Sequence, residues 1–358
     1  MSFEQFMDKA ISEWMKGNGP QSEIVISSRV RIARNLDGFP FPMLSTSSQA
    51  KQVVQRVYEV LQEDLQNLPE FKNARLIQMD DLQDLDKRVL MEKHLISPHL
   101  ADESRHGAVI LSQDESISIM INEEDHLRVQ CLFSGFQLEE AWELANRLDD
   151  AFEQKLNYAF DETHGYLTSC PTNVGTGIRA SVMVHLPALA MTGHINQLLP
   201  AIAQVGLAVR GIYGEGSETL GNLYQISNQV TLGQTEMEII DKLKGVVRQV
   251  IEHEQRARRQ VMERSPIQLE DRVLRSLGIL KYSRMIDSKE AMSRLSDVRL
   301  GIDLGFIQGI QASVMNELMV MTRPGFLQKY AQQRLEPGER DVRRSVLIRE
   351  RLSMENAH

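Results

Sequence analysis

The sequence has 358 residues, of which 42% are hydrophobic and 25% are charged, with a formal net charge of −9 and a pI near 5.6. This composition is that of a folded globular protein long enough for two domains, and it excludes overall disorder. The acidic balance argues against non-specific binding to nucleic acid. Lysine and arginine still number 40, and arginines recur inside apolar segments.

Residues 1–255 mix strand-like and helix-like segments. The strand candidates are rich in β-branched residues and end at Gly, Pro, Asn or Asp. They cover residues 23–32, 75–79, 107–112, 117–122, 126–132, 179–185 and 207–213. The helix candidates cover 48–67, 137–158, 187–203 and a long segment that starts at the capping box Thr235-x-x-Glu238. Hairpin-like spacing between 107 and 132 favours an antiparallel sheet with helices packed on it, an α+β fold.

Residues 256–358 lack strand signals and carry Arg, Glu, Leu and Met at helical spacing. Ser265-Pro266 predicts a helix start, and Ser288 and Ser296-Asp297 predict further caps. Pro-Gly pairs at 324 and 337 separate the rest. We therefore expect a small all-helical domain after position 255. Its apolar positions exceed what such a bundle needs to bury, which predicts a homodimer through this domain.

Two arginines end the first strand candidate, Arg29 and Arg31. Being two residues apart on a strand, they project to one face. Three more arginines, Arg128, Arg179 and Arg210, stand at strand ends or beside short turns. The planar, permanently charged guanidinium suits bidentate phosphate binding, so the set could surround a triphosphate. Each alone is more typical of a solvated surface, the glycine-rich pieces alone predict turns, and no P-loop sequence occurs.

Carboxylates accompany these arginines at Glu123, Glu124, Glu215 and Glu218. Paired carboxylates in loops are usually only solvated. Phosphoryl transfer to a guanidinium nevertheless requires a carboxylate, since the acceptor must be oriented and deprotonated as it attacks. Cys170 could be a thiolate stabilised by nearby cations, or a small buried hydrophobe. With only Cys131 besides it, at most one disulfide is available, and two reduced thiols are the simpler interpretation.

Together these segments resemble the catalytic domain of the phosphagen kinases over roughly residues 20–255. The resemblance rests on the Ser28-Arg29-Val30-Arg31 strand, Asn-Glu-Glu-Asp-His at 122–126, Cys-Pro-Thr-Asn-x-Gly-Thr-Gly-x-Arg at 170–179 and Arg-Gly-x-x-Gly-Glu-Gly-Ser at 210–217. It implies that ATP is the phosphoryl donor and that Mg²⁺ is held through ATP without a protein cage. It also implies that Glu124 is the principal catalytic carboxylate, that Glu215 holds the substrate guanidinium and that Cys170 lies against it.

The nucleotide-binding residues are carried over in the same way. The five arginines grip the phosphates and His94 flanks the nucleotide. The complete set implied by the resemblance is Ser28, Arg29, Val30, Arg31, His94, Arg128, Arg179, Ala180, Ser181, Val182, Met183, Arg210, Gly211, Ile212, Tyr213 and Gly214.

The chain departs from the metabolic phosphagen kinases at both ends. They carry a helical domain before the Ser-x-Arg-x-Arg strand, whereas this strand begins near residue 23 and an unrelated helical domain follows. This arrangement resembles the bacterial protein-arginine kinases, which implies arginine side chains of proteins as acceptors. The resemblance also implies a zinc-containing activator protein, a Clp-type unfoldase and a heat-shock repressor as partners, in stress-linked protein quality control.

An Arg-Asp-x-x-Arg motif at Arg340, Asp341 and Arg344 belongs to the same resemblance. In these kinases it forms a regulatory phosphoarginine pocket. Two arginines four apart on a helix could clamp one phosphate, with Asp341 pairing the guanidinium. The alternative is an exposed helix laced with salt bridges.

Two other functions remain open from sequence: a kinase for a small free guanidino compound, and a non-catalytic adaptor that binds phosphoarginine proteins. The start of the chain lacks the pattern of a signal peptide, and no apolar stretch is long enough for a membrane span. We therefore expect a cytoplasmic protein that contacts neither membrane nor nucleic acid.

Overall fold

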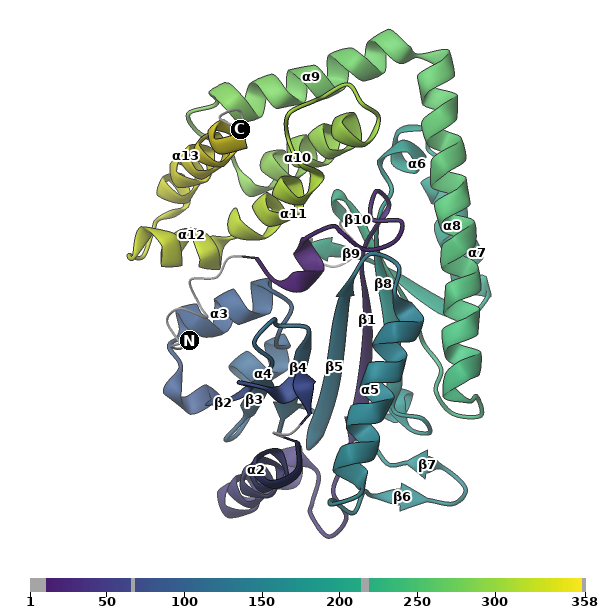
Figure 1. Ribbon diagram of the computed structural model, residues 1–358, viewed down its shortest axis with the longest axis vertical. Coiled ribbons are helices and arrows are strands. Elements are labelled where there is room, and N and C mark those ends of the chain that lie inside the picture. Colours follow the sequence, from purple (N-terminus) through teal and green to yellow (C-terminus); the bar gives the residue numbers. More distant parts are fainter. Residues whose placement is uncertain (1–10, 66–67, 214–218, 356–358) are drawn as a thin grey trace.

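The computed structural model describes residues 11–65, 68–213 and 219–355. Its centre is an eight-stranded antiparallel sheet in the order β2-β3-β4-β5-β1-β8-β10-β9, which confirms the predicted α+β fold (Figure 1). The strands are β1 (Val25–Arg34), β2 (Arg75–Gln78), β3 (Ala108–Leu111), β4 (Ile117–Ile121), β5 (Leu127–Ser134), β8 (Ile178–His185), β9 (Leu207–Tyr213) and β10 (Thr219–Asn228). A small hairpin of β6 (Phe160–Asp161) and β7 (Gly165–Tyr166) lies outside it.

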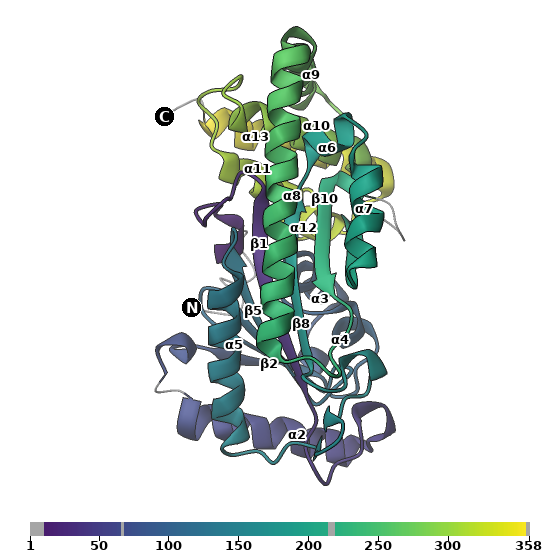
Figure 2. The same cartoon turned by 90° about the vertical axis from the view of Figure 1, so that its right-hand side faces the viewer.

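One face of the sheet is covered by long amphipathic helices. They are α2 (Ser47–Val60), α5 (Leu138–Glu153) and α8 (Glu236–Arg264). Leu138, Ala141, Ala145 and Leu148 recur at helical spacing along α5 and are buried against strand residues such as Val30. Figure 2 shows α5 and α8 side by side over the strands. This face of the sheet is therefore a closed hydrophobic core.

The opposite face is covered only in part. The C-terminal helices α9 (Pro266–Tyr282), α10 (Ser288–Asp303), α11 (Ala312–Met321), α12 (Pro324–Ala331) and α13 (Pro337–Glu355) pack at one end of it, together with α3 (Asp84–Glu92) and α4 (Pro98–Asp102). Leu132, Met183 and Leu223 of the strands join Leu295 and Val298 of α10 in a second core. The rest of this face carries polar and charged side chains.

The predicted helix start at Ser265-Pro266 is confirmed, and the two Pro-Gly pairs, predicted as breaks, each stand at the start of a helix. The cap predicted at Ser288 is one residue off, since Asp287 caps α10 and accepts from the Glu290 amide. The predicted cap at Ser296-Asp297 is wrong, since both residues are buried inside α10. Their polar groups are satisfied there by tertiary partners. The hydroxyl of Ser276 donates to Asp297 at 2.9 Å, and Ser296 meets His185 Nε2 at 2.8 Å. Helix α8 runs through position 255, and the boundary between 255 and 256 stays a prediction.

Other predicted elements differ in extent. The helix predicted over 187–203 is two helices, α6 (Pro187–Met191) and α7 (Ile195–Gln204), because Gly193 adopts a φ of 75°. The helix predicted to 67 ends at Val60 and continues as a single wide turn to Leu65. Strand β10 was not predicted. Its Gly221, Asn222 and Asn228 are typical of turns, yet it lies between β8 and β9.

Candidate active site

The register of the central strands places arginines in neighbouring positions on the partly open face. Arg31 on β1 lies directly opposite Arg179 on β8 and Gln130 on β5. Arg29, two residues earlier on β1, lies opposite Ser181. Since alternate residues of a strand share a face, the pairing collects these side chains on one surface.

Arg29 is held across three strands. Its Nε donates to Ser181 Oγ at 3.3 Å, and its Nη2 donates to Gln225 Oε1 at 3.0 Å. Gln225 belongs to β10 and pairs in register with Met183 and with Arg210 of β9. The same face therefore continues from Arg29 to Arg210 at the edge of the sheet.

The arginines perturb one another strongly. Burial holds the pKa of Arg31 well below its ordinary value, helped by the charges of Arg29, Arg128 and Arg179 and opposed by Glu123. Burial, Arg210 and Arg128 also lower the pKa of Arg179. The Nε of Arg31 and of Arg179 is buried and donates no hydrogen bond within the described residues. Buried donors without a partner are costly to a folded protein, so this cluster of mutually repelling arginines is suited to bind an anion.

The turn between β4 and β5 supplies two carboxylates to this cluster. Arg128 donates from Nη1 to Glu123 at 2.8 Å and from Nη2 to Glu124 at 2.9 Å. The Glu123 side chain is 2% exposed and also accepts from Ser97 at 2.5 Å, whereas that of Glu124 is 37% exposed. Glu123 is therefore part of the framework, and Glu124 is the carboxylate that a substrate can reach.

The Cys170 segment is tied to the same turn. Asp125 Oδ1 accepts from Asn35 Nδ2 and from the Ser169 amide, both at 2.7 Å. The Cys170 Sγ lies 3.0 Å from Thr172 Oγ1, and the Glu124 carboxylate acts to raise the pKa of Arg179. The Cys170 segment and the two carboxylates therefore belong to one framework. Cys131 is instead in the core, where burial raises the pKa of its thiol.

The neutral imidazole of His126 stabilises this framework through two hydrogen bonds. Its Nδ1 accepts from the Leu36 amide at 3.0 Å and its Nε2 donates to the Pro40 carbonyl at 3.0 Å. Burial lowers its pKa from 6.5 to about 4. The unfolded chain therefore takes up a proton below pH 6.5 that the folded chain refuses until about pH 4. This histidine's contribution to stability is complete above pH 6.5 and is lost as the pH falls.

We accordingly expect the free energy of unfolding to fall by about 2 kcal/mol between pH 7 and pH 5 on account of His126. Urea unfolding at both pH values measures the difference. His126→Asn, whose side chain does not titrate, is expected to reduce the fall by that amount. An equal fall in wild type and variant would contradict the assignment.

His94 lies at the border of the arginine face in a left-handed conformation, with a φ of 60°. Its carbonyl accepts from Gln130 Nε2 at 2.9 Å, and its ring meets the Trp14 ring edge-to-face at 5.5 Å. Both rings line a small cavity that also includes Arg29 and Gln225. Burial and Arg29 lower the pKa of His94 to about 3, so the ring is neutral at pH 7.

Trp14 is positioned from several sides. Its Nε1 donates to the Lys93 carbonyl at 3.3 Å, and Lys93 forms a buried ion pair with Glu115. The carbonyl of the adjacent Met15 accepts from Asn316 of α11 at 3.2 Å. Trp14 therefore connects the His94 turn to the C-terminal helices.

We expect Trp14→Ala to raise the KM for ATP by about 3- to 30-fold, because the His94 ring loses an aromatic contact and the Lys93 carbonyl loses a donor. The effect on kcat is expected to be smaller. Steady-state kinetics against ATP concentration measures both, and Trp14→Phe is expected to restore most of the loss. A KM unchanged in Trp14→Ala would remove Trp14 from the nucleotide site.

Several other residues predicted for ATP binding do not present their side chains on the arginine face. Val30, Ala180 and Val182 are buried in the core beneath the sheet, and Ser28 is turned away to the Gly135 carbonyl. Gly211, Ile212 and Tyr213 continue β9 beyond Arg210. Gly214 and Glu215 lie outside the described residues, as does Glu218. Gln225 and Trp14 were not predicted, the first because β10 was missed and the second because nothing in the sequence links it to His94.

The Arg-Asp-x-x-Arg motif lies on α13. Arg344 is 2% exposed and donates to the carbonyls of Thr322 and Ile286 at 3.0 and 2.9 Å and to Asp341 at 2.6 Å. Arg340 is half-buried and donates to the Leu335 carbonyl at 3.2 Å. Asp341 is thus already paired, and Arg340 is the more accessible of the two arginines.

No group of three or more His, Cys, Asp or Glu side chains gathers into a metal site within the described residues. The donors on the open face are cations, which suits a phosphate chain and not a bare metal ion. Among the described helices none is long and apolar enough to cross a bilayer.

The sheet, the converging arginines and the neighbouring carboxylate define a phosphotransferase of the guanidino kinase class. The family described as "ATP:guanido phosphotransferase, C-terminal catalytic domain" matches residues 52–257, and that described as "Protein-arginine kinase McsB C-terminal domain" matches residues 266–358. Among solved structures, the duplicated taurocyamine kinase from Schistosoma mansoni is 25% identical with a TM-score of 0.59, covering 66% of this chain and 34% of its own. A lombricine kinase shares the fold, with a TM-score of 0.57, 24% identity and 70% of each chain covered.

Curated relatives match almost the full length. A protein-arginine kinase of Halalkalibacterium halodurans is 61% identical over 99% of both chains. One of Brevibacillus brevis is 62% identical over 98% of both, and one of Bacillus subtilis is 55% identical over 99% of this chain and 97% of its own. The chain belongs to the protein-arginine kinase family, and it is a phosphotransferase that acts on arginine.

Proposed function

We propose that the chain transfers the γ-phosphoryl group of ATP to the guanidinium of arginine side chains in proteins, using the arginine face as the nucleotide site. The observation that carries this assignment is the pair of buried, unfilled guanidinium donors of Arg31 and Arg179 beside Glu124 and Cys170. A polyphosphate would satisfy these donors and neutralise the repulsion among the arginines.

In this proposal the arginines bind and orient the phosphates, and Ser181 and Gln225 fix the direction of Arg29. Arg210 contributes from the edge strand. Mg²⁺ fits this arrangement as an ion held by the phosphates of ATP, where it supplies charge neutralisation during transfer. By family resemblance His94 flanks the nucleotide, and Trp14 packs against His94 beside Arg29.

Glu124 is the proposed general base. The acceptor nitrogen forms a bond to the γ-phosphorus, the bond from that phosphorus to the bridging oxygen breaks, and ADP leaves. The proton lost by the guanidinium passes to the Glu124 carboxylate. By family resemblance Glu215 holds the guanidinium, and Cys170 lies against it.

A homodimer and a cytoplasmic location are expectations from the sequence. The further roles that rest on resemblance alone are a zinc-containing activator, delivery of marked proteins to a Clp-type unfoldase, inactivation of a heat-shock repressor and phosphoarginine regulation through Arg340, Asp341 and Arg344. The partial exposure of Arg340 is compatible with the last of these.

The acceptor class is tested by direct competition. With ATP and Mg²⁺, the enzyme is offered an unfolded arginine-bearing protein together with an excess of free arginine. Phosphate on the protein, with free arginine left unmodified, is the expected result. Transfer to free arginine alone would show that the chain is a kinase of small guanidino compounds.

A further inference from the structure

Strand β2 is one edge of the sheet, because only β3 pairs with it. The pairing phase follows from one hydrogen bond: the Met79 amide donates to the Gly107 carbonyl at 2.8 Å. In an antiparallel ladder hydrogen-bonded pairs alternate with non-bonded ones, so the backbone N–H and C=O groups of Ile77 also point toward β3. The N–H and C=O groups of Leu76 and Gln78 consequently point away from the sheet. They make no outward hydrogen bond within the described residues.

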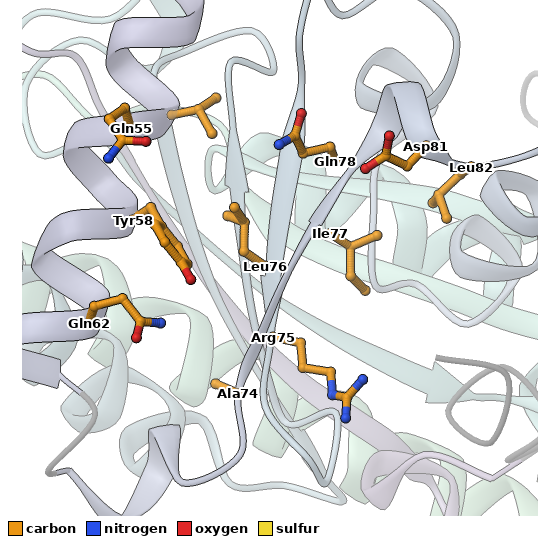
Figure 3. Close-up of a pocket in the computed structure, with 11 residues that line it drawn as sticks. Gln55, Tyr58, Gln62, Ala74, Arg75, Leu76, Ile77, Gln78, Asp81 and Leu82 are labelled. Atoms are coloured by element: carbon orange, nitrogen blue, oxygen red, sulfur yellow. The ribbon is translucent and has the colours of Figure 1, made fainter. Parts of the chain in front are cut away.

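This outer edge runs along a groove of about 670 Å³. Figure 3 shows Tyr58 of α2 and Gln62 of the turn after it on one side, and Ala74, Leu76 and Gln78 of the strand segment on the other. Val54 and Leu76 make part of its lining apolar, the exposed carboxylate of Asp81 lies at one end, and the exposed Arg75 also lines it. Native proteins usually cover or charge such an edge, so an open one invites a further strand.

The shape of the groove selects among occupants. A single extended segment can enter between α2 and β2 and pair with Leu76 and Gln78. The β2 strand of a second copy cannot, because its own α2 stands beside it and would meet α2 of the first copy. Asp81 favours a basic residue of the segment at that end, and Arg75, at the start of β2, favours an acidic residue at the other end. Val54 and Leu76 favour an apolar residue between them.

We propose that this groove docks an extended segment of the substrate protein, with a basic residue at the Asp81 end, which adds to the sheet as a strand beside β2. The inference rests on the proposed function, since it assigns a second contact to the same protein substrate. Three strands, β2, β3 and β4, lie between the docked segment and β5, so the docked segment lies about 19 Å from the nearest arginine strand. A flexible chain therefore reaches both sites, and docking raises the local concentration of its arginines.

Binding is tested without catalysis. The probe is a peptide of about ten residues that alternates valine and threonine, ends in lysine and contains no arginine. Its addition is expected to slow amide exchange at Leu76 and Gln78 about tenfold or more, while Ile77, already bonded to β3, changes little. A peptide of the same composition with proline at alternate positions is the control. Unchanged exchange at Leu76 and Gln78 with the first peptide would overturn the proposal.

A substitution tests the role in catalysis. Gln78 has a φ of −82°, which proline accepts, so Gln78→Pro removes the outward N–H without disturbing the bonds to β3. The KM for an unfolded arginine-bearing protein is expected to rise about fivefold, the effect of one hydrogen bond. The KM for an arginine tripeptide, too short to reach the groove, is expected to stay unchanged.

Gln83→Pro is the matched control, since Gln83 is exposed, has a φ of −73° and lies outside the groove. Equal KM values in both proline variants would contradict docking, and so would a rise for protein and tripeptide alike. If light scattering showed a dimer for wild type and a monomer for Gln78→Pro, the occupant of the groove would be a second copy of the chain and not a substrate segment. Wild type that phosphorylates no protein would refute the proposed function, whereas the exchange experiment would still decide whether the groove binds a strand.

Discussion

Replacement of Glu124 by glutamine is expected to lower kcat for phosphoryl transfer by about 10²- to 10⁴-fold, with little change in the affinity for ATP. The amide keeps the shape of the side chain and can still accept a hydrogen bond from Arg128 Nη2. It cannot take a proton from the guanidinium. The loss therefore falls on the chemical step, and it is measured by single-turnover kinetics beside equilibrium binding of ATP.

Glu123→Gln is the matched control from the same turn. Its carboxylate is buried between Ser97 and Arg128, so its replacement weakens the framework. We expect a lower free energy of unfolding and weaker ATP binding, with a smaller effect on kcat. Similar kcat losses in both variants would show that Glu124 acts only by holding Arg128.

Replacement of Arg31 by methionine is expected to have opposite effects on stability and on binding. The charge is partly buried, surrounded by other arginines and has an unfilled Nε. An apolar side chain of similar length removes this repulsion, which should raise the free energy of unfolding by about 1–2 kcal/mol. Loss of a charged contact to phosphate should weaken ATP binding about 10- to 100-fold. Urea unfolding without nucleotide and calorimetric titration with ATP measure the two effects.

Arg34, on the same strand, is the control, because its replacement is expected to lower the free energy of unfolding instead of raising it. It donates to Asp149 at 2.6 Å and to the Thr176 carbonyl at 2.9 Å, and its side chain is buried. Arg34→Met leaves an unpaired buried carboxylate, so we expect a loss of about 3–5 kcal/mol. A destabilised Arg31→Met would mean that Arg31 serves the fold and not an anion.

The part of the site that sequence could predict is the part that rests on local pattern. Arg29 and Arg31 share a face because they are two apart on a strand, and the structure confirms that placement. The partner of Arg29 could not be found in this way, because Gln225 lies in a strand whose glycine and asparagine residues predict turns. Trp14 reaches His94 from a distant segment through tertiary packing alone.

For the C-terminal motif, too, local spacing could predict the secondary structure but not the tertiary contacts. Helical spacing placed Arg340 and Arg344 on one face, and both lie on α13. Spacing could not reveal that Arg344 binds two main-chain carbonyls from neighbouring segments. Burial is set by packing between helices, so the phosphoarginine pocket stays a prediction.

The most direct test of the account is mass spectrometry, under non-acidic conditions, of an arginine-rich protein incubated with the enzyme, ATP and Mg²⁺. Phosphoarginine is expected on the protein with wild type, and none above background is expected with Glu124→Gln. Phosphoarginine formed equally by both, or absent from the protein with an active wild-type enzyme, would contradict it.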